Sequence, residues 1–490
     1  MISLRPALIL GGILGVYLLL AGAQADTARP WFDEAIHAGP ALDLVTRGVM
    51  GYPIGEPCRF TGAPGWHNRM YQTMPLSHIG PAIWYKFVGF GILRMRWYAI
   101  LWGLIVLLSW GYIVRILMDS WIPGMLTMLL LATVHVFVGG AASGRPDMMS
   151  AGLAALGLLS YVVLRQRSSL GIAILASQAF FCASLFTHPV GALPVFLLLF
   201  LVVKWDLRRL RWSYLWVAAV PYVIGFGLWG WYISQDFANF RLQFLGWNAA
   251  GRQDGLTHPL QSFYHEFTER YGGVYLPAYS TGIRRITIVI PLVFAWAVAG
   301  LLLRPQKGRL VGSMTVVLFV VFSLLEPKKY PFYLLPMAIM LCCSTGAWLW
   351  QEWAAGRWRR WMAAGMLVAL VLVQVGWTAY ACRQDPYHNS YLRVIAYLNQ
   401  HASSKSLIMG DSELAFGRGF YSNFIADSTL GYCSGKHADF IVVSFNGFAE
   451  LFKVFETEDA GLDRYVHQTL TEDYRKVYVD RIYTIYQRRS

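Results

Sequence analysis

Long apolar segments recur along most of this chain. Runs of roughly 17–22 apolar residues follow one another between residues 7 and 381, and each can cross a hydrocarbon core about 30 Å thick. Only 14% of the 490 residues are charged and the mean hydropathy is +0.44, whereas a soluble domain carries about 25% charged residues. The sequence therefore predicts an α-helical membrane protein that crosses the bilayer many times.

Short loops between the apolar segments carry much of the excess positive charge. The formal net charge is +14, and Lys and Arg residues concentrate in the loops 165–167, 204–211, 304–309 and 357–360. Short basic loops stay on the cytoplasmic side of a membrane. We therefore interpret them as cytoplasmic loops beside anionic membrane lipids, and we expect no nucleic-acid partner.

These loops define a predicted topology with a cytoplasmic N-terminus and an external C-terminus. Residues 76–92 are interpreted as an interfacial or re-entrant helix, because a further span there would move the later basic loops outside. A count of up to 13 spans stays open. The eleven expected spans lie near residues 7–23, 97–117, 122–140, 147–164, 170–186, 189–203, 213–232, 284–303, 309–325, 329–350 and 360–381.

The N-terminus allows a second interpretation. Arg5, the apolar run to Ala21 and the small residues after it also fit a signal peptide cleaved after Ala25. Cleavage would leave Asp33 and Glu34 near the mature N-terminus, without the helix that should position them.

The predicted external face consists of two long loops, 24–96 and 233–283, and a tail, 382–490. In the tail, "SLIMGD", "ADFIVVSF" and "KVYVDRIYTIYQ" are typical of strands, and "YLRVIAYLNQHA" and "DSELAFGRGF" of helices. Alternating strands and helices predict a small periplasmic α/β domain over 382–490. Residues 1–381, with both loops, form the predicted transmembrane domain.

The six cysteines divide by location. Cys182, Cys342 and Cys343 fall within predicted spans, whereas Cys58, Cys382 and Cys433 fall on the oxidising external side. A disulfide between Cys382 and Cys433 is compatible with this distribution.

Four polar clusters interrupt the apolar pattern, all on the predicted external face. Each has a structural explanation: a helix cap, a local ion pair, a residue at a Pro bend, or Lys side chains that extend to the interface. Together on one face, however, carboxylates and cations favour a single site. The clusters are Asp33, Glu34 and His37; Arg145 and Asp147; His188; and Glu326, Lys328, Lys329, Tyr330 and Tyr333.

This combination suits the transfer of a sugar from a lipid phosphate. The phosphate leaves without protonation and needs only cations that stabilise its developing charge. The acceptor hydroxyl needs one carboxylate as general base, whereas a hydrolytic glycosidase uses two carboxyl groups.

Several motifs occur together in a familiar order. They are the Asp-Glu pair after the first span, "YQTMPL" before an embedded helix, "SGRPDMM", "THPVGALPVFLL" and "EPKKYPFYLLPMAIML". In this ordered set, residues 1–381 resemble the GT-C superfamily of membrane glycosyltransferases, in the branch of the protein O-mannosyltransferases and the lipid A aminoarabinose transferase. A periplasmic α/β tail also occurs in that branch.

The resemblance implies a multi-pass enzyme of the bacterial inner membrane. Its donor would be a polyprenyl-phosphate-linked sugar, and its acceptor a lipid, a glycan or a protein on the periplasmic face. One departure is clear: where the aminoarabinose enzyme has Glu-Lys before a Pro, this chain has Thr73 and Met74. The donor contacts and the sugar therefore do not carry over.

The resemblance also implies site residues. Asp33 matches the acidic residue of the first external loop, proposed as base or acceptor-positioning group, with Glu34 beside it, and Asp147 matches a second acidic position. The donor-phosphate set comprises Arg145, His188, which stands where relatives have Lys or a similar residue, and the residues of the "K-x-P-x-Y" region, Lys328, Lys329, Tyr330 and Tyr333.

Three alternatives remain open. A divalent metal is conceivable because Asp33 and His37 share a helix face, although the chain has no HExxH motif; other external histidines are His67, His78, His258 and His265. A second alternative is a glycan ligase that uses a lipid-pyrophosphate donor. The third is a non-enzymatic lipid or glycan transporter, which predicts mid-span charges; such charges are nearly absent here.

Overall fold

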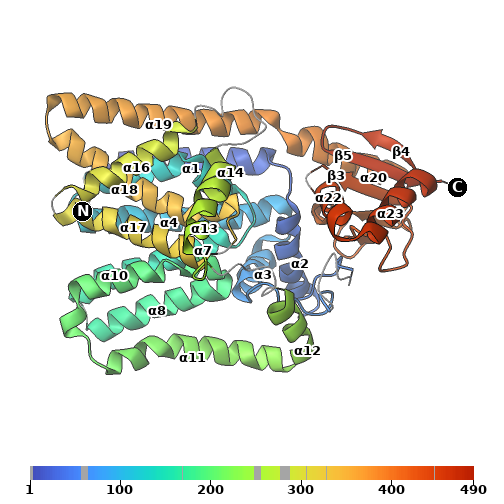
Figure 1. Cartoon of the computed structure of the whole chain (residues 1–490), viewed down its shortest axis with the longest axis horizontal. Coiled ribbons are helices and arrows are strands. Elements are labelled where there is room, and N and C mark those ends of the chain that lie inside the picture. Colours follow the sequence, from blue (N-terminus) through green and yellow to red (C-terminus); the bar gives the residue numbers. More distant parts are fainter. Residues whose placement is uncertain are drawn as a thin grey trace. The chain divides into compact units, whose positions relative to one another are not determined.

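The computed structural model describes residues 4–56, 65–167, 169–247, 255–275, 287–304, 306–326, 328–445 and 447–489. The chain divides into two compact units (Figure 1). Unit 1 comprises Met1–Ala25, Ala99–Tyr232 and Gly251–Ala381. Unit 2 comprises Asp26–Tyr98, Ile233–Ala250 and Cys382–Ser490. The predicted domain boundary at residue 381 stays a prediction.

Eight helices of the described chain are long and apolar enough to cross a membrane. A bent pair and two shorter apolar helices supplement them, so each of the eleven predicted spans has a helical counterpart. The pair, α5 (Trp121–Thr133) and α6 (His135–Ala142), bends by 61°. The short ones are α16 (Val289–Leu302) and the segment of α9 (Pro189–Ala192) and α10 (Val195–Trp205). The eight are α1 (Leu4–Thr27), α4 (Ile92–Met118), α7 (Asp147–Arg167), α8 (Leu170–Thr187), α11 (Ser213–Ser234), α17 (Gln306–Leu325), α18 (Leu335–Ala354) and α19 (Arg357–Gln384).

Helix α18 forms the centre of unit 1. Most of it is buried, and it packs against α5, α16 and α17. Small and hydroxyl-bearing residues bring the helices close together, as is usual in membranes. The Ser150 hydroxyl of α7 donates to the carbonyl oxygen of Ser184 in α8 at 2.9 Å. A side chain at Gly191 would come within 2.0 Å of the Ser150 Oγ atom, so the close approach of α9 to α7 requires glycine at this position.

Unit 2 contains a five-stranded sheet of order β2-β1-β3-β5-β4. Strands β2, β1 and β3 are parallel, and β5 is antiparallel to both β3 and β4. Ile408 pairs with Phe424 on one side and with Phe440 on the other. The strands are β1 (Ile408–Gly410), β2 (Phe424–Ile425), β3 (Phe440–Ser444), β4 (Tyr474–Val479) and β5 (Tyr483–Arg488).

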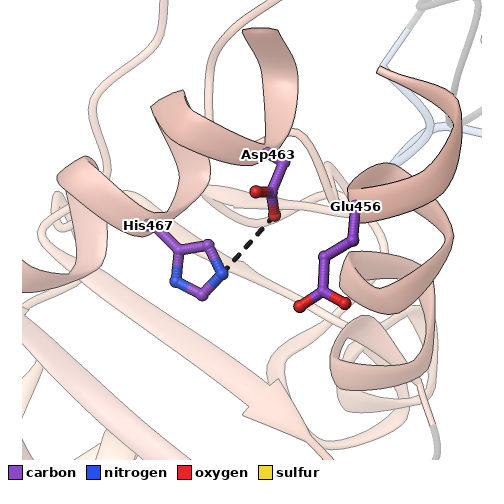
Figure 2. A group of neighbouring side chains, drawn as sticks. All are labelled: Glu456, Asp463 and His467. Atoms are coloured by element: carbon purple, nitrogen blue, oxygen red, sulfur yellow. Dashed lines mark ion pairs between the residues drawn. The ribbon is translucent and has the colours of Figure 1, made fainter. Parts of the chain in front are cut away.

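The two faces of this sheet have different partners, because side chains alternate along a strand. Ile408 and Val442 pack in one core with α20 (Leu392–His401) and with α2 (Phe32–Thr46), which comes from the first external loop. Met409 and Ile441 on the other face pack with α22 (Phe448–Glu458) and α23 (Ala460–Gln468). Figure 2 shows three polar side chains on these two helices. The loop 24–96 and the tail therefore share one hydrophobic core.

The predicted fold class, a polytopic α-helical protein with a small α/β domain, is confirmed. The three predicted strand segments correspond to β1, β3 and the β4–β5 hairpin, while "DSELAFGRGF" forms a short 3-10 turn followed by α21 (Ala415–Arg418). Residues 76–92 contain α3 (Leu76–Val88), which is not among the candidate spans.

The structure decides the cysteine pairing that the sequence left open. Cys382 lies within the continuous helix α19 and is a free thiol, whereas Cys433 forms a disulfide. A bond between these two residues is therefore ruled out. Cys58 lies outside the described residues, as do 248–254 and 276–286 of the second external loop.

Candidate functional site

In unit 1, Arg145 lies in the bend before α7, beside the first turn of that helix. Its Nε atom contacts the Asp147 carboxylate at 2.7 Å, and its guanidinium lies 4.1 Å from the centre of the Phe332 ring. Arg145 is buried. Asp147 is well placed at the helix N-terminus, where the helix dipole stabilises negative charge. Asp147 and Phe332 thus hold the Arg145 guanidinium between a carboxylate and an aromatic ring face.

His188 and the aromatic segment after α17 join this group. His188 links the end of α8 to the start of α9 with an extended backbone (φ −159°), which suits a residue before proline. Its ring centre lies 5.5 Å from that of Tyr333, and the Arg145 guanidinium lies 5.9 Å from the same Tyr333 ring. Tyr330 stacks on Phe332 at 5.1 Å. Three of the four predicted clusters thus meet in unit 1.

The two lysines of this segment differ. Lys329 is buried, and its Nζ atom donates to the carbonyl oxygens of Ser323 and Glu326, both at 2.7 Å, beyond the end of α17. It also contacts Glu266 at 3.2 Å. Burial lowers the pKa of Lys329. Lys328 is half-buried and forms no ion pair with any described residue. Lys329 therefore anchors the segment, whereas the amine of Lys328 remains available.

Sequence reasoning missed the partner that holds Glu266. Arg270 donates to Glu266 at 2.9 Å and to the carbonyl oxygen of Lys328 at 3.2 Å, and both charged side chains are fully buried. Their spacing of four residues on a helical segment was the available signal.

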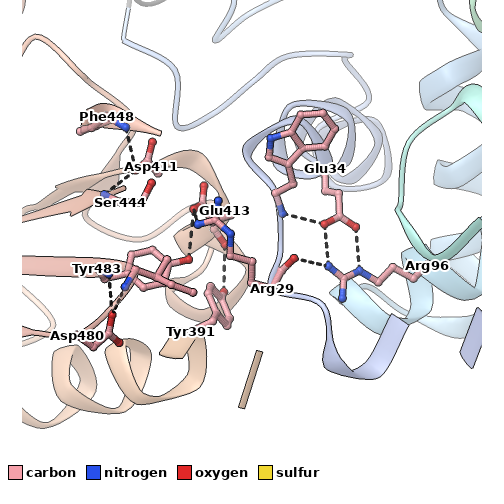
Figure 3. Close-up of polar contacts among 12 residues, drawn as sticks. Arg29, Glu34, Arg96, Tyr391, Asp411, Glu413, Ser444, Phe448, Asp480 and Tyr483 are labelled. Carbon is pink, nitrogen blue, oxygen red and sulfur yellow. Dashed lines mark hydrogen bonds and ion pairs between the residues drawn. The ribbon is translucent and has the colours of Figure 1, made fainter. Parts of the chain in front are cut away.

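In unit 2, Glu34 is held by Arg96, a residue that the sequence did not single out (Figure 3). Arg96 donates from Nε to Oε1 at 2.9 Å and from Nη2 to Oε2 at 2.8 Å. Glu34 also accepts the backbone N–H of Trp31 at 2.9 Å and so caps α2. Both side chains are buried. Glu34 thus fixes the first turn of α2, in which Asp33 lies half-buried.

Figure 3 also shows a buried carboxyl pair of the tail, Asp411 and Glu413. Asp411 accepts the backbone N–H groups of Ser444 at 3.1 Å and Phe448 at 3.3 Å. Glu413 accepts the Tyr483 hydroxyl at 3.3 Å. Asp411 directly follows β1, at the carboxyl edge of the parallel strands, where α/β folds commonly place polar groups. That position was the sequence signal for this pair.

The buried pair adjoins the first external loop within unit 2. The Arg29 guanidinium lies 3.9 Å from the Glu413 carboxylate. Burial raises the pKa of Glu413 and of Asp411. Burial likewise raises the pKa of the Tyr52 hydroxyl, with smaller contributions from the negative charges of Glu413 and Asp33. Asp33 therefore shares its electrostatic surroundings with carboxyl groups of the tail.

Thr73, one of the two residues that stand in place of Glu-Lys in this chain, contacts His78. The Thr73 hydroxyl lies 2.5 Å from His78 Nε2, and the His78 ring centre lies 6.3 Å from that of His37. Burial lowers the pKa of His78 to about 4, so its imidazole is neutral at physiological pH. This pair packs against α2 instead of presenting a charged Glu-Lys pair.

No group of three metal-ligating side chains that includes Asp33 or His37 occurs among the described residues. The group that does occur there is Glu456, Asp463 and His467, which Figure 2 shows on α22 and α23.

A small apolar hollow lies within unit 1. Residues of α4, α7, α17, α18 and the α9–α10 segment line it: Trp110, Ala151, Ala154, Ala155, Gly191, Pro194, Leu318, Pro336 and Ile339.

Comparison with known proteins rests on structure. No protein-family model and no curated protein matches the sequence. ArnT from Cupriavidus metallidurans bound to undecaprenyl phosphate matches with a TM-score of 0.61 at 16% identity, over 99% of this chain and 98% of that chain. The archaeal oligosaccharyltransferase AglB from Archaeoglobus fulgidus, in complex with an inhibitory peptide and a dolichol-phosphate, matches with a TM-score of 0.51 at 11% identity, over 88% of this chain and 69% of that chain.

These findings establish the class of fold. The chain is a multi-pass helical membrane protein that carries a small α/β domain. Its fold is similar to that of ArnT over nearly the whole of both chains, so the fold expected from the ordered motifs is confirmed.

Proposed function

We propose that this chain is an inverting glycosyltransferase of the GT-C type. It would transfer a hexosyl or pentosyl group from a polyprenyl-phosphate donor to a lipid, polysaccharide or protein acceptor, on the periplasmic face of the bacterial inner membrane. The observation that carries the proposal is the group formed by Arg145, His188 and Tyr333, in a chain with the fold of a structure that binds undecaprenyl phosphate.

Arg145 suits the donor phosphate. Its charge is held rigidly by Asp147 and Phe332, and a planar guanidinium binds phosphate through paired N–H groups. The amine of Lys328 supplies the second cation, and His188 and Tyr333 supply polar side-chain groups beside the phosphate. Lys329 acts by holding the segment that carries Tyr330 and Tyr333.

The reaction then needs one base. The acceptor oxygen attacks the anomeric carbon, the bond from that carbon to the phosphate oxygen breaks, and the electron pair leaves with the lipid phosphate. The acceptor proton passes to a carboxylate. We assign that role to Asp33, with Glu34 fixing its helix turn, and a supporting electrostatic role to Asp147. The assignment of Asp33 rests on its match to the family position.

A transfer assay with a synthetic polyprenyl-phosphate sugar tests the phosphate assignment. Arg145→Lys keeps the charge but loses the paired donors, so turnover should fall by about a factor of ten or more. Arg165→Lys is a matched control, because Arg165 also pairs with a carboxylate, Asp206, at 2.7 Å and lies 4.6 Å from a Trp ring, in a predicted cytoplasmic loop. Equal losses in both variants would contradict the assignment.

Asp33→Asn tests the base. Loss of a general base typically costs about 10²–10⁴-fold in rate. Asp236→Asn is the control, since Asp236 is a half-buried acid of the same unit that bonds to Asn239 at 2.9 Å. Unchanged turnover of Asp33→Asn removes Asp33 from the mechanism.

The same assay distinguishes the rival functions. Transfer from a lipid-pyrophosphate donor but not from the monophosphate would identify a glycan ligase. Movement of the intact glycolipid across vesicle membranes, without any transfer, would identify a transporter.

A further inference from the structure

Helices α22 and α23 bring three metal-ligating side chains together, none of which belongs to the proposed transferase site. Glu456 extends from α22, and Asp463 and His467 extend from one face of α23, four residues apart (Figure 2). One ligand atom from each side chain lies within 4.8 Å of the other two. Three potential donors therefore lie close together near the protein surface.

The spacing of two of these donors suits a shared ion. The Asp463 Oδ1 atom lies 3.4 Å from His467 Nε2, which is longer than a typical N–H···O hydrogen bond of about 2.7–3.2 Å. Two ligands of a tetrahedral Zn²⁺ ion, each about 2.1 Å from the metal, lie about 3.4 Å apart. A metal ion between them therefore requires little movement of either side chain.

A second observation concerns Asp463. Its Oδ1 atom is shielded from solvent and forms no hydrogen bond in the described part of the chain, where its partner is His467 in the 3.4 Å ion pair. An ion bound between these two atoms would lie closer to the carboxylate oxygen than the imidazole does.

The scaffold of the three ligands is rigid. Phe455 of α22 and Leu462 and Val466 of α23 are buried in one core against the sheet. The Asp459 carboxylate accepts the backbone N–H groups of Gly461 and Leu462, both at 3.0 Å, and so fixes the turn between the helices. Ligands on two such helices are held in place before an ion binds.

We propose that Glu456, Asp463 and His467 bind one divalent transition-metal ion of the Zn²⁺ type, which fastens α22 to α23. Two carboxylates and a neutral imidazole provide two negative charges for a dication, and water completes the coordination. The imidazole favours Zn²⁺ and related ions over Mg²⁺ and Ca²⁺, which prefer oxygen ligands. The site is independent of the proposed transferase activity.

Titration of the full-length protein with Zn²⁺ tests this site. The protein is purified in detergent through a tag without histidine, stripped with a chelator, and titrated calorimetrically. We expect one equivalent whose affinity falls at least about tenfold in both His467→Ala and Glu456→Gln, and a Zn²⁺-dependent rise in Tm that both variants lose. Mg²⁺ should produce neither signal.

His388→Ala is the matched control. His388 pairs with Asp385 at 2.8 Å and is likewise partly exposed, but it belongs to no three-ligand group among the described residues. Its substitution should leave the Zn²⁺ affinity unchanged. Absence of Zn²⁺ binding to the wild-type protein, or equal binding by wild type and His467→Ala, would overturn the proposal.

Discussion

Glu34 and Asp33 are neighbours in the chain with different surroundings. Glu34 is buried in a two-bond contact with Arg96, whereas Asp33 is half-buried in the same helix turn. Arg96 also donates to the carbonyl oxygens of Ala28 at 2.7 Å and Arg29 at 3.0 Å. Arg96 therefore ties α4 to the chain that enters α2, and the orientation of Asp33 depends on it.

Removal of Arg96 should be strongly destabilising. Arg96→Ala leaves the Glu34 carboxylate buried without its cation, which typically costs about 3–5 kcal/mol. Thermal unfolding in detergent measures the change. Arg94→Ala is the control, because Arg94 is exposed and donates to one carbonyl oxygen; its cost should stay within about 0.5 kcal/mol. Similar losses in both variants would contradict a special role for Arg96.

Glu413 gives unit 2 a characteristic pH dependence. Burial, and next the neighbouring Asp411, raise the pKa of Glu413, so the folded chain keeps a proton that the unfolded chain loses above pH ~4.3. Where the folded state binds more protons, stability falls as pH rises. The contribution is complete below the unfolded pKa and is lost as pH rises through the folded pKa.

Glu413→Gln should flatten this dependence. The amide cannot ionise, so the variant avoids the loss of stability that the wild type suffers as pH rises from acid toward neutral. Tm measured across that range in wild type and variant tests the expectation. Glu472→Gln replaces an exposed acid and should follow the wild-type curve. A Glu413→Gln curve parallel to that of wild type would refute the expectation.

At the scale of elements, the helix break between α8 and α9 positions much of unit 1. Proline disfavours the helical conformation of the residue before it. His188, which precedes Pro189, therefore has an extended backbone, and its ring lies near that of Tyr333. The same break places Gly191 and Pro194 on the wall of the apolar hollow. One short interruption thus contributes to both the polar group and the hollow.

The small apolar hollow of unit 1 leaves no space for a larger side chain. Ala155 of α7 lines it and is buried, so Ala155→Phe must displace its neighbours, and such overpacking typically costs about 1–3 kcal/mol. We expect a lower Tm in thermal unfolding in detergent. Ala369→Phe makes the same change on an exposed position of α19 and should leave Tm nearly unchanged. Equal Tm values for wild type and Ala155→Phe would contradict the expectation.

The sequence predicted the elements better than the contacts between them. Each predicted apolar span corresponds to a helix, and the order of motifs singled out Arg145 and His188, which the structure brings beside the same Tyr333 ring. Arg96 was missed because it contacts Glu34 from 62 positions away, a distance at which a single sequence carries no pairing signal. The sequence placed Lys329 in the donor-phosphate set. Its contacts with backbone carbonyl oxygens could not be foreseen, because such contacts have no sequence signature.

At the scale of the molecule, the division into units does not follow the order of the chain. The first external loop and the tail lie far apart in sequence, yet Ala35 and Tyr52 share a core with Ile408 and Val442. The apolar periodicity of either segment alone does not predict this shared core. The core depends on how the apolar side chains of the loop fit against those of the tail, which are distant in sequence. Unit 2 therefore joins Asp33 to the α/β tail as one folded body.

The positive-inside pattern makes a prediction about the orientation of the whole molecule. Unit 2 should face the periplasm, and the basic loop near Arg208 should face the cytoplasm. Single cysteines at Ser404 and Arg208, both exposed, test this in a background in which Cys182, Cys342, Cys343 and Cys382 are replaced by serine or alanine. In intact spheroplasts, a membrane-impermeant maleimide should label Ser404→Cys at once and Arg208→Cys only after permeabilisation. The background without an added cysteine reports any non-specific reaction. The opposite labelling pattern would reverse the topology and would place the carboxylate of Asp33 on the wrong side for a periplasmic acceptor.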